Sequence, residues 1–297
     1  MEELYLVYMA LSALILLYIL WCFIEPFFLV RDRAVLKRSQ KDTSSSDNLT
    51  VKKLPMLPQG TSGSPDFRFV FFSDTHAEWC PVSSKRICDA ISKAHAKAPL
   101  DAVIFGGDMS SYRQGAARGF KYLNAISSCC KELGIPFYGV SGNHDIHICN
   151  IPETAGFISL DNTHITLTSR TSGSNAVLAG LSDTGRKNRV WHEMPVLDGN
   201  DPVILVVHDP DALLHFEPQT RPDYMISGHL HGGQMKFPFR IEFCVLRRHD
   251  KLPNMGAVQG VYNIGGTTVF ISRGLGCGVM PFRFLSVPEV TVTEIYL

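Results

Sequence analysis

The sequence predicts an α/β protein in which two β-sheets pack against each other with helices outside, preceded by one N-terminal transmembrane helix. Three observations support this fold class. A long uncharged apolar run lies near the N-terminus, residues 67–140 alternate between β-prone runs and helical segments, and the second half holds many further short β-prone runs. Such alternation is typical of a largely parallel sheet, and closely spaced strands favour antiparallel pairs.

The apolar run, residues 4–24, contains no charged side chain. A stretch of about 20 apolar residues is long enough to cross a bilayer as a helix. A cleaved signal peptide is disfavoured, because Glu2 and Glu3 replace a basic start and no small-x-small cleavage site follows. We therefore assign residues 1–30 to a membrane anchor.

Flanking charge predicts the orientation of this anchor. No Lys or Arg precedes the run, and five follow it closely: Arg31, Arg33, Lys37, Arg38 and Lys41. The positive-inside bias places such a flank in the cytoplasm. We expect a single-pass protein of the cell membrane whose folded domain faces the cytoplasm.

Composition agrees with that location. The eight cysteines of the 297-residue chain include no C-x-x-C pair, and Cys129 and Cys130 are adjacent. Reduced cytosolic thiols are therefore favoured over a disulfide framework. Lys plus Arg and Asp plus Glu both number 28, so the formal net charge is zero. Without a charge excess, we expect no nucleic-acid binding.

Residues 31–66 are basic at first and then rich in Ser, Thr, Lys, Pro and Gly, without periodicity. This composition is typical of a flexible linker. We therefore expect the folded domain to span residues 67–297.

Within that domain, short apolar runs predict strands at 67–73, 100–105 and 135–140. Helices are predicted between them, at 83–97 with Ser83 or Ser84 as the N-cap, and at 114–133 with Gly134 as the stop. This order implies right-handed crossovers. Six further strands are predicted in the second half: 164–168, 176–181, 203–207, 224–227, 266–272 and 290–296.

Potential metal ligands follow five of these strands. They lie in the clusters Asp74-Thr75-His76, Gly106-Gly107-Asp108, Gly142-Asn143-His144-Asp145, Val206-Val207-His208 and Gly228-His229-Leu230-His231. Ligands bind where loops leave the carboxyl ends of strands in such folds. The sequence therefore predicts one shared metal site.

The residue types favour a pair of divalent ions. Two such ions about 3.5–4 Å apart need a bridging carboxylate. Asp108 is the candidate, because the two glycines before it allow close approach of the backbone. Mixed carboxylate and imidazole ligands suit Mn²⁺, Fe²⁺ or Zn²⁺. Asn143 would contribute a neutral carbonyl oxygen.

The five clusters, in this order, resemble the calcineurin-like metallophosphoesterases. The motifs His229-Leu230-His231-Gly232-Gly233-Gln234, Arg273-Gly274-Leu275-Gly276 and Pro281-Phe282-Arg283 are similar to those of the membrane-associated bacterial branch. That branch contains phosphodiesterases and a UDP-2,3-diacylglucosamine pyrophosphatase of lipid A synthesis. The resemblance implies a four-layer α-β-β-α sandwich of two mixed sheets.

The resemblance also implies roles for individual residues. The ligands would be Asp74, His76 and His231 for the first ion, Asn143, His208 and His229 for the second, and Asp108 between both. His144 would act at the leaving group and Asp145 would orient it. The reaction would be in-line attack of a metal-bridged hydroxide on phosphorus.

The sequence is compatible with more than one substrate class and with alternative roles for two further features. The pattern fits a phosphodiesterase, a lipid-nucleotide pyrophosphatase whose substrate is lipid-linked, or a metal-free scaffold of the same fold. Arg273 either contacts substrate phosphate or is held in an internal salt bridge. The aromatic and basic segment 236–255 either covers the site or touches lipid, or it is an ordinary hairpin.

Overall fold

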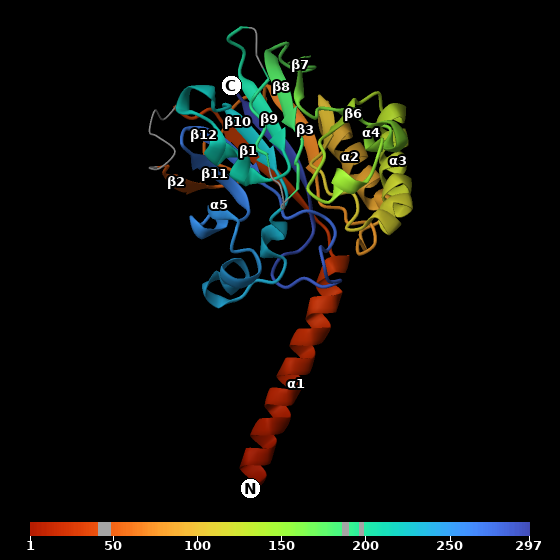
Figure 1. Cartoon of the computed structure of the whole chain (residues 1–297), viewed down its shortest axis with the longest axis vertical. Helices are drawn as coiled ribbons and strands as arrows, with labels where there is room; N and C mark the ends of the chain where they lie inside the picture. Colours follow the sequence, from red (N-terminus) through yellow and green to blue (C-terminus); the bar gives the residue numbers. More distant parts are fainter. Residues whose placement is uncertain (41–48, 186–189, 196–198) are drawn as a thin grey trace.

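The computed structural model describes residues 1–40, 49–185, 190–195 and 199–297. Helix α1 (Glu2–Ile24) extends away from one end of a domain built around two sheets (Figure 1). This helix is long and apolar enough to cross a membrane. Most of its side chains are exposed, and only Cys22 is buried among them.

The first sheet has six strands in the described part of the chain, in the order β1-β13-β3-β4-β5-β6. Their bounds are β1 (Val30–Lys37), β3 (Phe67–Phe72), β4 (Ala102–Phe105), β5 (Phe137–Gly139), β6 (Ile158–Ser159) and β13 (Glu289–Tyr296). Strands β3 to β6 are parallel, as predicted from the strand–helix alternation. Strand β13 runs antiparallel to β3 and parallel to β1.

The second sheet has seven described strands in the order β2-β11-β12-β10-β9-β8-β7. Their bounds are β2 (Val51–Leu54), β7 (Thr163–Thr168), β8 (Asn175–Leu181), β9 (Val203–Val207), β10 (Tyr224–Ser227), β11 (Gly260–Ile264) and β12 (Thr267–Ile271). The β7–β8 pair is an antiparallel hairpin of the kind expected from close spacing, and β11, which the sequence did not predict, forms a second one with β12. The central strands β8, β9, β10 and β12 are parallel.

Strand β3 shows how the layers form, because alternate side chains of a strand point to opposite faces. Phe67, Phe69 and Phe71 lie in the core between the two sheets. Val70 and Phe72 pack instead with the outer helices α2 (Ser84–Lys97), α3 (Ala116–Glu132) and α4 (Ile151–Ala155). The result is the predicted arrangement of two mixed sheets with helices outside.

Short segments cover the outer face of the second sheet. They are the 3₁₀ turn Pro210–His215 and helix α5 (Lys251–Asn254), and a further turn, Pro218–Thr220, has no buried residue. Segment 236–255 is not a hairpin, since it forms the turn Pro238–Arg240, the π-helical turn Glu242–Leu246 and then α5. Further single turns are Glu25–Phe27, Arg113–Gly115, Asp145–His147 and His231–Gly233.

The prediction of a flexible linker over residues 31–66 is wrong for much of its described part. Strand β1 pairs with β13 along its whole length, and β2 pairs with β11. Ala34, Val35 and Leu36 are buried, so this segment belongs to the core. A basic side chain of this segment also bonds to the domain, since Arg33 donates to Glu294 on β13 at 2.7 Å. Residues 41–48 lie outside the described residues.

We predict that Leu36→Ala lowers the free energy of unfolding by about 2–5 kcal/mol, as expected for a fully buried Leu in a packed core. Lys37→Ala, at an exposed position on the same strand, should change it by less than about 0.5 kcal/mol. Thermal or urea unfolding of the detergent-solubilised chain measures both. Equal stability of the two variants would contradict a core role for β1.

Candidate metal centre

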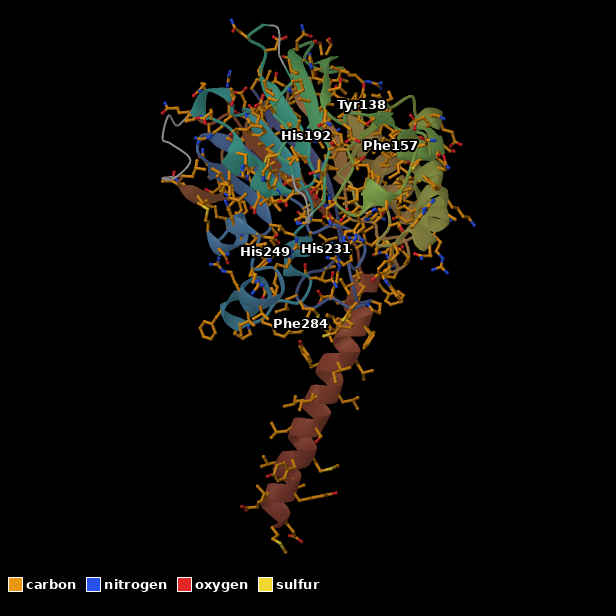
Figure 2. All side chains as sticks on the ribbon, in the orientation of Figure 1. Tyr138, Phe157, His192, His231, His249 and Phe284 are labelled. Atoms are coloured by element: carbon orange, nitrogen blue, oxygen red, sulfur yellow. The ribbon has the colours of Figure 1, made fainter. Side chains whose placement is uncertain are left out.

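The predicted ligands meet where strands of both sheets end. Asp74 and His76 follow β3, Asp108 follows β4, and His208 follows β9. In two groups the ligand atoms lie within 4.8 Å of one another: Asp74, His76 and His231 in one, Asp108, His208 and His229 in the other. Figure 2 shows His231 in the half of the domain that adjoins the C-terminal end of α1.

Asp108 joins the two groups. Its Oδ2 lies 3.1 Å from His208 Nε2 and 3.6 Å from His76 Nε2. Within the first group, His76 Nε2 and His231 Nε2 are 3.1 Å apart, and Asp74 Oδ1 lies 3.4 Å from His231 Nε2. One carboxylate therefore reaches both sets of imidazoles, which is the geometry expected of a bridging ligand.

The backbone is forced into this arrangement. Five of the predicted ligands have positive φ although none is glycine: Asp74, His76, Asp108, His229 and His231. Such conformations are uncommon for these residues and cluster at functional sites. Position 107, directly before Asp108, requires glycine. Its φ is 90°, and a Cβ there would lie only 2.6 Å from the Gly142 nitrogen.

Hydrogen bonds fix which ring nitrogen of two histidines is available. The Gly106 carbonyl accepts from His208 Nδ1 at 2.7 Å, so Nδ1 carries a proton and Nε2 is the nitrogen that faces Asp108. Ser111 Oγ donates to the Gly278 carbonyl and lies 3.0 Å from His76 Nδ1. Because the hydroxyl has one proton, it accepts from His76, and the lone pair on Nε2 faces Asp108.

Burial keeps several ligands in the form that binds metal. It lowers the pKa of His76 to about 4 and holds the pKa values of His229 and His231 well below the usual range. Burial alone would raise the pKa of Asp108, but the nearby histidines, above all His208, more than offset this effect. The pKa of Asp108 therefore lies well below its usual value. Neutral imidazoles and an ionised carboxylate are the states required of metal ligands.

The second ligand set also contains buried polar atoms without a hydrogen bond, although carboxylate oxygens lie near two of them. Asn143 Oδ1, His208 Nε2 and His229 Nε2 are buried without a hydrogen bond among the described residues. Such atoms are rare in proteins unless water or an ion satisfies them. These three residues are the predicted ligands of the second ion, so the side chains fit a cation at this place.

A family model for calcineurin-like phosphoesterases matches residues 67–233, more than half of the chain. The chain belongs to this family. Membership confirms the resemblance drawn from the motifs and makes the protein a phosphoesterase hydrolase. The His and Asp groups described above accord with the two divalent ions of the family.

Relatives match a larger share of the chain than the family model does. The metallophosphoesterase YkuE of Bacillus subtilis is 29% identical over 81% of this chain and 82% of that protein. The phosphodiesterase YaeI of Escherichia coli is 27% identical over 77% of this chain and 82% of its own length. The UDP-2,3-diacylglucosamine pyrophosphatase LpxG of Chlamydia muridarum is 26% identical over 58% of this chain and half of its own.

The phosphoesterase motif residue Asp145 has a different contact from the one expected. We predicted that it orients His144, but its carboxylate accepts from the backbone nitrogens of Asp108, Met109 and Gly142 at 2.8–2.9 Å. In the described structure the Ser111 carbonyl, 3.1 Å away, holds His144 Nδ1 instead. Asp145 therefore positions the backbone that carries the bridging carboxylate.

Arg273 forms the internal salt bridge considered above, and its contact with substrate stays a prediction. Its side chain donates to Glu289 at 2.7 Å and lies 3.5 Å from Asp32. Arg283 lies at the site, fully buried and bonded to the carbonyls of Gly276, Arg273 and Ser286. Its Nη2 lies 3.3 Å from His231 Nδ1.

The sequence did not predict two carboxylates that lie close to His229. Asp209 Oδ2 and Asp250 Oδ1 lie 3.5 and 3.9 Å from its Nε2. Arg247 donates to Asp250 and, at 2.8 Å, to the carbonyl of His229. Asp209 directly follows the predicted ligand His208, which is the one local signal that points to it.

We predict that Ser111→Ala weakens metal binding by about tenfold, because His76 loses the partner that fixes its tautomer. Activity should recover at higher metal concentration, and a metal titration of the apo protein measures the shift. The matched variant Ser64→Ala, at an exposed position, should bind as the wild type does. An unchanged metal affinity in Ser111→Ala would contradict the assigned tautomer.

Proposed function

We propose that the protein is a membrane-anchored phosphoesterase that hydrolyses a phosphodiester or a related phosphate ester with two divalent ions. The observation that carries this proposal is the position of Asp108 between two groups of buried ligands. The ligand types suit Mn²⁺, Fe²⁺ or Zn²⁺. The family match supports the reaction class, and the ligand residues in both groups argue against a metal-free scaffold.

Each residue of the site has a defined task in this proposal. Asp74, His76 and His231 would hold the first ion, Asn143, His208 and His229 the second, with Asp108 shared. When bound, the ions supply a water of lowered pKa and neutralise charge on the phosphoryl oxygens. His144, fixed through Nδ1, keeps Nε2 available to protonate or stabilise the leaving oxygen.

Helix α1 supports anchoring in the cell membrane, and the basic residues that follow it support a cytoplasmic domain. The seven cysteines whose side chains are described are free thiols, which suits that compartment.

A lipid-nucleotide pyrophosphatase is the second candidate. The similarity to LpxG and the apolar helix favour it. Assaying the purified chain with an aryl phosphodiester and with UDP-2,3-diacylglucosamine separates the two. A specificity constant at least about 100-fold higher for the lipid nucleotide, close to 3 kcal/mol of extra transition-state binding, would select this candidate.

We predict that Asp108→Ala lowers Mn²⁺-dependent hydrolysis of an aryl phosphodiester by about 10³-fold or more, since the loss of metal catalysis costs several kcal/mol. Circular dichroism should show a retained fold, and bound metal per chain should fall. Asp89→Ala, on the outer helix α2, serves as the matched control. Undiminished turnover in Asp108→Ala would refute the shared-carboxylate mechanism.

We predict that a membrane-impermeant maleimide labels Cys149, which is exposed, only after cells are permeabilised. This follows from a cytoplasmic domain. Cys149→Ser identifies the signal of that thiol against the other cysteines. Labelling of Cys149 in intact cells would show the opposite orientation.

A further inference from the structure

Six exposed apolar side chains lie on two segments near the C-terminal end of α1. We call them the apolar rim: Phe239, Ile241, Val245, Val279, Met280 and Leu285. Phe239 is 94% exposed, Val279 71% and Val245 65%, so the fold of the domain does not use them. Figure 1 shows the turns that carry the first three at the end of the domain from which α1 leaves.

Both segments are tied to the helix. Phe284 stacks edge-on against Tyr18 with centroids 4.7 Å apart, and the Arg283 nitrogen donates to the Cys22 carbonyl. The Glu25 carboxylate accepts from the nitrogens of Leu285 and Ser286 at 2.8 and 2.6 Å.

The first segment joins this assembly through the second. The Phe284 nitrogen donates to the Gln234 carbonyl, and the Lys236 nitrogen donates to the Phe284 carbonyl. The rim is therefore held at a fixed place relative to the last turns of α1.

The length of the helix then places the rim. Domain contacts begin at Tyr18, so the uncharged part of α1 that is free of the domain covers residues 4–17. At 1.5 Å per residue this part is about 21 Å long. The hydrocarbon core of a bilayer is about 30 Å thick. A spanning α1 therefore brings its domain-bound turns, and the segments bound to them, to the membrane boundary.

Charge near the rim agrees with this position. The two acidic residues of its first segment, Glu242 and Asp250, are buried. Arg240 and Arg248 are exposed, so the free charge beside the apolar side chains is basic. Basic and aromatic side chains together are typical of surfaces that lie in the headgroup region of anionic membranes.

We propose that the apolar rim is embedded in the boundary layer of the bilayer and seats the domain directly on the membrane. The proposal rests on the membrane anchoring proposed above. It also sets the position of the metal centre, because Ser286 Oγ donates to the His231 carbonyl at 2.6 Å. Figure 2 shows His231 and Phe284 toward the same end of the domain. The centre thus lies one loop away from the lipid surface.

The test uses the full chain in vesicles of phosphatidylcholine and phosphatidylglycerol. Phe239→Trp and Val245→Trp introduce reporters into the rim, and Ile158→Trp is the matched control, at an exposed position on β6 far from α1. Brominated acyl chains quench tryptophan only at close range. We expect quenching of the added emission to be at least about twofold greater for the rim variants than for the control.

Three readouts keep the outcomes apart. Equal quenching of rim and control reporters, in a wild-type chain that resists alkaline extraction, overturns the rim proposal and leaves the anchor intact. Release of the wild-type chain by alkali overturns both. A blue-shifted but unquenched reporter in a chain that runs as a dimer in detergent assigns the rim to a second copy instead. Aryl phosphodiester hydrolysis should be unchanged in all three variants.

Discussion

The shared position of Asp108 is the constraint on which the centre depends. A carboxylate can lie within reach of two groups of imidazoles only if the ends of β3, β4, β9 and β10 meet closely. The structure achieves this with positive φ at five non-glycine ligands and with a glycine at position 107, where a side chain would collide with the neighbouring loop. Asp145 adds three hydrogen bonds to the backbone around Asp108. The two sheets therefore serve to hold a strained set of loops.

Much of this arrangement could be predicted because it is encoded locally. Strands such as Val203–Val207 and Tyr224–Ser227 are short apolar runs ended by ligand residues, and their bounds match the prediction. Helix α2 likewise begins after the predicted cap Ser83. Both features depend on side chains that are neighbours in sequence, so composition and spacing are sufficient to find them.

The errors concern contacts between distant residues. Strand β1 reads as a charged linker, because its stability comes from Glu294 and from a core that the local sequence does not show. The two arginines near the site could not be told apart for the same reason. Arg273 pairs with Glu289, whereas Arg283 contacts four backbone carbonyls and Nδ1 of His231. The role of segment 236–255 could not be predicted, because an aromatic run does not reveal which of its side chains the core buries. Phe243 is buried, whereas Phe239 is exposed.

The pairing of β1 with β13 has a consequence for biogenesis. Paired residues of the two strands, such as Val30 and Glu289, lie about 260 residues apart in sequence, and closing so long a loop carries an entropic cost before any contact offsets it. As the ribosome delivers the chain, β1 emerges directly behind the anchor, yet its partner is translated near the end. With the anchoring proposed above, the nascent protein would be held at the membrane while the edge of β1 is still unpaired. Chaperones or misassembly can act in this interval.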